Sequence, residues 1–223
     1  VNMPMSEKQD NIYWEKTSER PVGEIIAENV DPETYMQQYA AHNTEWVRGY
    51  VVKMAGVNIT HYAIVQYLHK IFDAYFALNP IGIVTGEPFV MRLDVVPSRR
   101  EPDLQLILND NPGDITDTAM VGPADICIEV VSSESISRDY GEKFVEYEQG
   151  GVREYWIVDP IRRTCHFWRM NGDNLYTPAP ISDDDTYSTP ILPRLKLHIP
   201  TLWQYPLPTY YQIGEAVKKM FED

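Results

Sequence analysis

A chain of 223 residues, 43% hydrophobic and 12% aromatic, can bury one substantial core, and its two cysteines, Cys127 and Cys165, exclude a disulfide framework. No stretch approaches the roughly 20 apolar residues of a membrane-spanning helix, and the N-terminus lacks the basic-then-apolar pattern of a signal peptide. The net charge of −14 argues against tight non-specific binding to nucleic acid, although basic pairs remain at Arg99–Arg100, Arg162–Arg163 and Lys218–Lys219. We expect a cytoplasmic protein that has no contact with a membrane.

No Gly/Ser-rich linker divides the chain, so we expect one domain over residues 1–223. Its first part, 1–43, is predicted to be an irregular arm up to residue 30, followed by one helix. Asp31 is suited to cap this helix and Pro32 to occupy its first position. We expect the helix to end near His42.

The middle part, 44–178, is predicted to form the core. A hairpin over 45–54, with Gly49 near its reversal, leads into the longest helical signal, an apolar stripe over Thr60–Leu78. Apolar runs separated by turn residues then predict, in chain order, strands at 82–85, 88–93, 103–108 and 123–132, a helix at 137–149, a strand at 154–158 and a hairpin formed by 163–169 and 175–178. This order indicates an α/β fold in which a mixed β-sheet is flanked by helices.

The last part, 179–223, contains five prolines between Pro190 and Pro208. Proline removes a backbone donor and fixes φ, so we expect an extended arm here. A final helix is predicted over Ile213–Phe221.

Two carboxylates and a lysine carry the strongest chemical signal. Asp103 follows a proline at the head of one apolar run, Glu129 lies inside a second, and Lys143 follows on the predicted helix. A buried strand rarely carries a carboxylate unless a partner compensates the cost of desolvation. Two such strands leading to a lysine-bearing helix suggest a divalent metal as that partner, as phosphodiester hydrolysis would require.

Each residue also has a structural interpretation. Asp103 could cap a turn at a strand end, and Lys143 could form a solvated ion pair with Glu146 on the same helix face. Glu129 is harder to explain in this way, because its neighbours on both sides are apolar and indicate burial on both faces of the sheet.

A longer pattern extends this reading. The segment 132–147, which includes Arg-Asp-Tyr-Gly-Glu-Lys, and the following Gly-Val-Arg-Glu-Tyr-Trp-Ile-Val-Asp-Pro at 151–160 resemble the Uma-type restriction endonuclease family. That family is part of the PD-(D/E)XK nuclease superfamily, and the resemblance runs from about Glu45 to about His198. It implies a restriction-endonuclease-like core, with an added N-terminal helix and a C-terminal hairpin and arm.

The resemblance also implies a site. The family's Pro-Asp falls on Asp103 and its strand glutamate on Glu129, which would bind Mg²⁺ or Mn²⁺ together with the main-chain carbonyl of Val130. The usual Glu-x-Lys lysine is absent, because Val131 stands in its place. In this family the lysine is thought to have moved to the following helix, where Lys143 matches it.

Further positions match less completely. Tyr147 matches the family pattern, and so does Glu45, although Tyr50 stands where a second acidic residue is common and Ser132-Ser133 replaces a Ser-Pro. Two other residues are candidates with structural alternatives, namely Glu87 for a second metal position and His61 for a phosphate contact. Glu87 could equally be a strand-end turn residue, and His61 an ordinary position at a helix N-terminus.

The implied activity is metal-dependent cleavage of DNA by an endonuclease, with a homodimer as one expected assembly. A nuclease fold that serves in nucleic-acid or protein interaction without cutting is the alternative that the acidic composition favours. A hydrolase acting on another phosphate or an acyl substrate fits the ligands as well. It has no supporting motif, because the chain lacks a Gly-rich phosphate loop, a Gly-x-Ser-x-Gly and a His-Glu-x-x-His.

Overall fold

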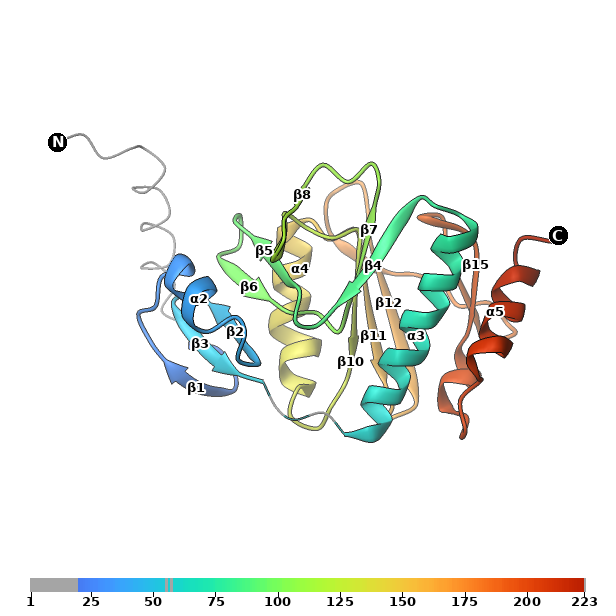
Figure 1. Cartoon of the computed structure of the whole chain (residues 1–223), viewed down its shortest axis with the longest axis horizontal. Coiled ribbons are helices and arrows are strands. Elements are labelled where there is room, and N and C mark those ends of the chain that lie inside the picture. The colour runs from blue at the N-terminus through green and yellow to red at the C-terminus, as the bar shows by residue number, and fades with distance from the viewer. Residues whose placement is uncertain (1–19, 55, 57, 223) are drawn as a thin grey trace.

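The computed structural model describes residues 20–54, 56 and 58–222 and has the predicted mixed α/β architecture. Its centre is a six-stranded mixed sheet with the order β13-β12-β11-β10-β7-β4. The strands are β4 (Gly82–Gly86), β7 (Leu104–Leu108), β10 (Ile126–Val130), β11 (Glu154–Asp159), β12 (Thr164–Met170) and β13 (Tyr176–Pro178). Figure 1 shows α3 (Ile59–Leu78) on one side of this sheet and α4 (Lys143–Gly150) on the other.

Alternate residues of the central strands pack against these two helices, as the period of two along a strand requires. Ile126, Ile128 and Val130 lie in the apolar cluster that includes α3. Cys127 lies with Tyr155 in a second cluster that includes α4. The alternation directs the single charged side chain of β10 toward α4 and away from α3.

The predicted crossover next to β10 is confirmed. β10 and β11 are parallel, and α4 connects them. The predicted single helix over 137–149 is instead a π-helical turn, Arg138–Glu142, followed by α4. Gly151 ends the helix with φ of 89°, a conformation that glycine adopts without the steric cost of a Cβ atom.

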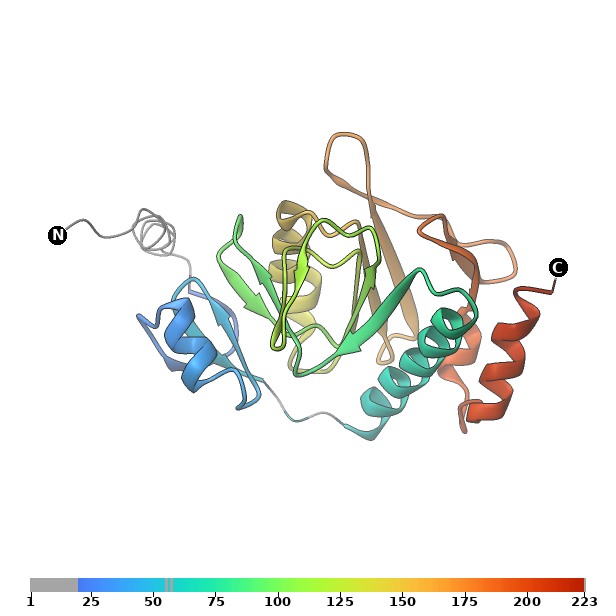
Figure 2. The same ribbon diagram turned by 45° about the horizontal axis from the view of Figure 1, so that its top comes forward.

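A second sheet of seven strands has the order β1-β3-β2-β6-β5-β9-β8, and Figure 2 shows α2 (Pro32–Gln38) beside its β1–β3 end. Its strands are β1 (Glu24–Ala27), β2 (Thr44–Val47), β3 (Tyr50–Lys53), β5 (Val90–Leu93), β6 (Ser98–Arg100), β8 (Asp114–Ile115) and β9 (Ala119–Val121).

This sheet corrects part of the sequence prediction. Asp31 caps α2 as expected, but the helix already ends at Gln38. β1 lies within the predicted irregular arm, because pairing with β3 supplies backbone partners that local sequence does not reveal. Residues 1–19 of that arm lie outside the described residues.

The C-terminal part is also more regular than the predicted extended arm. β14 (Thr186–Thr189) and β15 (Leu192–His198) form a two-stranded sheet, a 3-10 helix follows at Ile199–Trp203, and α5 spans Tyr210–Lys219. The prolines fit this arrangement, because a two-stranded sheet has only edge strands and Pro200 stands in the first turn of the 3-10 helix. Figures 1 and 2 show α5 beside α3.

The long apolar stripe of α3 is largely as predicted, since Leu68, Phe72 and Tyr75 are fully buried. Tyr62 is an exception and is half exposed, while Ile64 takes its place in the core. No helix in the described part of the chain combines the length and hydrophobicity that crossing a membrane requires.

Candidate active site

A small cavity of about 30 Å³ lies where the start of α3 meets the ends of β7 and β10 and the π-helical turn. Asp103, Glu129 and Lys143 all line it, together with His61 and Glu87. A larger groove of about 360 Å³ along α3 shares His61, Glu87 and Asp103 with this cavity. The fold therefore brings the three principal candidates to one point beside an open groove.

Asp103 is held at the head of β7 by the neighbouring strand. Its Oδ2 accepts a hydrogen bond from the backbone N–H of Val130 at 2.6 Å and lies 3.2 Å from Nε2 of His61. The residue is only 7% exposed. In the described part of the chain both contacts use Oδ2, which leaves Oδ1 for another ligand. The contact across strands, and not a local turn, fixes this carboxylate.

Glu129 is buried, as its apolar neighbours predict, and both of its oxygens have partners. Oε1 accepts a hydrogen bond from the hydroxyl of Tyr147 at 2.8 Å, and Oε2 lies 2.9 Å from Nζ of Lys143. Burial raises the pKa of this carboxyl well above its usual range, and the adjacent ammonium works against that rise. Tyr147 thus joins the site by orienting Glu129.

Lys143 does not form the solvent-exposed ion pair with Glu146 that the sequence offered as its structural interpretation. Its side chain is 1% exposed, and Nζ lies 3.4 Å from Oε1 of Glu45 and 3.6 Å from Oδ1 of Asp139, in addition to Glu129. Burial would lower the pKa of this ammonium, but the three carboxylates outweigh burial and raise it above its ordinary value. Lys143 therefore stays protonated at neutral pH.

Glu45 connects this lysine to a second buried cation. Its Oε2 accepts a hydrogen bond from Nη1 of Arg100 at 2.8 Å, and Oε1 accepts one from the backbone N–H of Glu101 at 3.2 Å. Arg100 also binds both oxygens of Glu146, at 2.8 and 2.9 Å. Burial would raise the pKa of Glu45, but Lys143 and Arg100 lower it to about 2. Glu45 is therefore a fixed anion that holds Lys143 in place.

This network also removes one candidate surface for nucleic acid. Arg100, half of a basic pair in the sequence, is fully buried and engaged by carboxylates. Sequence reasoning treated the pair as a source of positive charge and missed its structural role. The local sequence of β6 could not reveal this role, because Glu45 and Glu146 come from distant parts of the chain.

His61 and Glu87 differ in how closely they join the site. His61 is 5% exposed and contacts Asp103, and its Nδ1 has no hydrogen-bond partner among the described residues. Burial would lower its pKa, but the bond to Asp103 and the charge of Asp103 raise it. Glu87 reaches solvent, and partial desolvation together with the charge of Asp103 raises its pKa to about 7.

Two buried carboxylates at the site were not predicted. Asp139 accepts a hydrogen bond from Ser135 and contacts Lys143 one helical turn later, a spacing that could have identified it. Glu101 is 1% exposed, and its Oε1 has no hydrogen-bond partner in the described part of the chain. Burial, followed by the charges of Glu45 and Glu87, raises the pKa of Glu101 to about 8. Glu101 is therefore mainly protonated at neutral pH.

Glu101→Gln is expected to stabilise the protein increasingly as the pH rises from about 4.5 to about 8. Over this range folded Glu101 keeps a proton that the unfolded chain has released, so the free energy of unfolding of the wild type falls with pH. Glutamine removes this loss, and the gain should reach roughly 1–3 kcal/mol at pH 8. Denaturant unfolding in EDTA at several pH values measures it, with exposed Glu134→Gln as the control. A stability difference that does not change with pH would contradict the assignment.

The donor set at the cavity fits a divalent cation. Within the described residues, no group of three or more His, Cys, Asp or Glu side chains is arranged to hold a metal ion. Mg²⁺ does not require such a group, because it is commonly bound by one or two carboxylates and keeps several waters. After burial, the charge of Asp103 raises the pKa of Glu87, and the charges of Asp139 and Asp103 raise that of Glu129. The carboxylates therefore repel one another, and a bound cation would relieve that repulsion.

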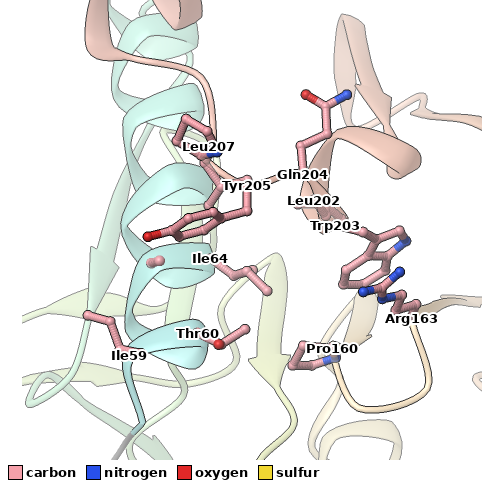
Figure 3. Close-up of a pocket in the computed structure, with 12 residues that line it drawn as sticks. Ile59, Thr60, Ile64, Pro160, Arg163, Leu202, Trp203, Gln204, Tyr205 and Leu207 are labelled. Atoms are coloured by element: carbon pink, nitrogen blue, oxygen red, sulfur yellow. The ribbon is translucent and has the colours of Figure 1, made fainter.

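A separate pocket of about 440 Å³ lies on another face of the first turn of α3. Figure 3 shows Trp203 and Arg163 across this pocket from Thr60. Thr60 lines this pocket, whereas the next residue, His61, lines the carboxylate cavity. Tyr205, which also lines this pocket, is fully exposed.

Comparisons with known proteins agree with this architecture. The sequence profile of the Uma2 family, described as "Putative restriction endonuclease", matches residues 32–200. The chain also resembles the crystal structure of a "putative nuclease" from Anabaena variabilis that belongs to a domain family of unknown function. The TM-score is 0.65 at 15% sequence identity, and the match covers 77% of this chain and 96% of that chain. No curated protein matches this chain. The predicted fold and the predicted family are confirmed.

Proposed function

Because the chain belongs to the Uma2 family of restriction endonuclease-like proteins, we propose that it is a metal-dependent endonuclease that hydrolyses phosphodiester bonds of DNA. One observation carries this proposal. Asp103 and Glu129 come from two adjacent strands and meet a buried, protonated Lys143 in a single cavity beside an open groove. Mg²⁺ is the proposed cofactor, and Mn²⁺ a substitute.

The residues of the cavity have distinct proposed roles. Asp103 and Glu129, with the carbonyl of Val130, would hold the metal, which when bound polarises a phosphate oxygen and lowers the pKa of a bound water. Lys143 stabilises the negative charge that develops on the phosphate, or orients the attacking water. Glu45 keeps this ammonium protonated and fixed.

Two supporting residues act through these groups. Tyr147 orients Glu129 by its hydrogen bond, and His61 positions Asp103. Nδ1 of His61 has no partner among the described residues, so a phosphate contact there remains a prediction. Glu87 lies at the entrance from the groove, where a second metal position remains a prediction as well. A homodimer and a cytoplasmic location also stay predictions from the sequence.

A nuclease fold that binds without cutting is the second candidate. The net charge of −14 and the burial of Arg100 both weaken electrostatic attraction to a phosphate backbone and favour it. The three buried charges at the cavity favour catalysis, because desolvating them is costly and an inactive site gains nothing from retaining them.

A cleavage panel tests the function. Supercoiled plasmid and single- and double-stranded oligonucleotides are incubated with the protein and Mg²⁺, Mn²⁺ or EDTA. Metal-dependent nicking or cutting that EDTA abolishes supports the endonuclease. Absence of cleavage on all substrates, together with retained oligonucleotide binding, would favour the binding protein.

A further inference from the structure

Arg138, the first residue of the π-helical turn, is buried, and no described residue forms a hydrogen bond or an ion pair with its guanidinium. It is 3% exposed, and within the described residues its Nε has no hydrogen-bond partner. No ion pair joins its guanidinium to a carboxylate in the described part of the chain. Its charge acts on Glu45 and Asp139 only through space.

This state is unusual for arginine. The guanidinium carries a full charge and five N–H donors, and burying such a group unpaired is costly. Buried Arg100, by contrast, is engaged by the carboxylates of Glu45, Glu142 and Glu146. The same fold thus gives each nitrogen of Arg100 a carboxylate partner, whereas the guanidinium of Arg138 has none among the described residues. This difference points to a ligand that the protein alone does not supply.

The position of Arg138 identifies where that ligand would lie. Arg138 lines the same small cavity as Asp103, Glu129 and Lys143. On its other side it packs against Gly23, where a Cβ atom would lie 3.1 Å from Nη1 of Arg138 and 2.7 Å from the side chain of Val52. The absence of a side chain at Gly23 therefore gives the guanidinium its room beside the cavity.

We propose that Arg138 binds a phosphate group at this cavity, with its guanidinium donating hydrogen bonds to non-bridging phosphate oxygens. The proposal rests on the proposed function, in which that phosphate belongs to a nucleic-acid backbone. Arginine suits this task, because its planar guanidinium can donate two parallel hydrogen bonds to two oxygens of one phosphate. The guanidinium also stays protonated over the whole pH range in which proteins are folded. The groove that shares Asp103 with the cavity offers the backbone a path to this point.

The first experiment uses inorganic phosphate as the probe, in Mg²⁺, with binding measured by isothermal titration calorimetry. Arg138→Gln is expected to weaken phosphate binding by about 10- to 100-fold, the loss typical of one charge-assisted contact. Arg138→Lys keeps the positive charge but cannot donate two parallel hydrogen bonds, so it should weaken phosphate binding less than Arg138→Gln does. Arg162→Gln, which changes an exposed arginine paired with Asp159, is the matched control and should bind as the wild type does.

The second experiment measures oligonucleotide cleavage by the same variants. Arg138→Gln should lower kcat/KM by about 10- to 100-fold, and the dependence of log KM on log salt concentration should become shallower by about one unit. Thermal melts confirm that each variant is folded. Since the guanidinium has no bonded partner among the described residues, the Tm of Arg138→Gln should stay within about 4 °C of the wild type.

The outcomes separate this proposal from the nuclease itself. If phosphate binding depends on Arg138 and no DNA is cleaved, the phosphate site is supported and the proposed endonuclease activity is rejected. Cleavage that Arg138→Gln leaves unchanged keeps the endonuclease and overturns the phosphate site. Equal phosphate binding by the wild type and Arg138→Gln, or none by the wild type, overturns it as well.

Discussion

Lys143→Met is expected to lower Mg²⁺-dependent cleavage by about 10²–10³-fold, the usual cost of removing one group that stabilises transition-state charge. Methionine keeps most of the volume of the side chain and removes only the ammonium. The same change should destabilise the fold by about 3–5 kcal/mol, because it leaves three buried carboxylates around the site without their shared cation. Single-turnover cleavage and denaturant unfolding measure the two effects.

A double variant separates the loss of activity from the loss of stability. Lys143→Met combined with Glu45→Gln removes one of the three carboxylate charges that face position 143, so part of the lost stability should return while cleavage stays low. Lys196→Met, at an exposed position of β15, is the matched control and should change neither property. If Lys143→Met cleaves at the wild-type rate in a folded state, Lys143 has no part in catalysis.

Arg100→Met is the second substitution with a large expected effect, and it acts first on stability. It should lower the free energy of unfolding by about 3–5 kcal/mol, because Glu45 and Glu146 would remain buried without their guanidinium partner. Burial would then raise the pKa of Glu45, which Lys143 and Arg100 now hold at about 2. Urea unfolding at pH 7 measures the change.

The loss should extend to the site. Once Glu45 is no longer fixed by Arg100, it holds Lys143 less firmly, so cleavage should fall even where the variant is still fully folded. Arg162→Met removes an exposed arginine, for which an ion pair contributes at most about 1 kcal/mol, and provides the comparison. A similar stability loss in both variants would show that the buried network has no special role.

Much of the core could be predicted because its signals are local. The stripe of α3, the apolar runs of β7 and β10 and the glycine that ends α4 each reflect short-range periodicity or backbone freedom. Asp103 and Glu129 could be predicted for the same reason, because a carboxylate at the start of an apolar run or within one can be recognised from the sequence alone.

The rest depends on partners that are distant in sequence. β1 and the three-residue β6 are strands only because β3, β2 and β5 lie beside them. Lys143 follows an ordinary helical pattern, and its burial is tolerable because Glu129, Glu45 and Asp139 surround its ammonium, two of them from strands of the fold. Arg138 likewise looks like a surface residue in sequence, since nothing local indicates the cavity that it lines.

The most direct test of the central claim compares cleavage of one plasmid by the wild type and by Asp103→Asn in Mg²⁺. Asparagine keeps the shape of the side chain and its acceptor for the Val130 N–H, but it removes the charge that would hold the metal. We predict at least an about 10²-fold loss of rate, since a catalytic metal contributes several kcal/mol to transition-state stabilisation. Exposed Asp110→Asn should cleave normally. Metal-dependent cleavage by Asp103→Asn at the wild-type rate would contradict a metal centre at this cavity.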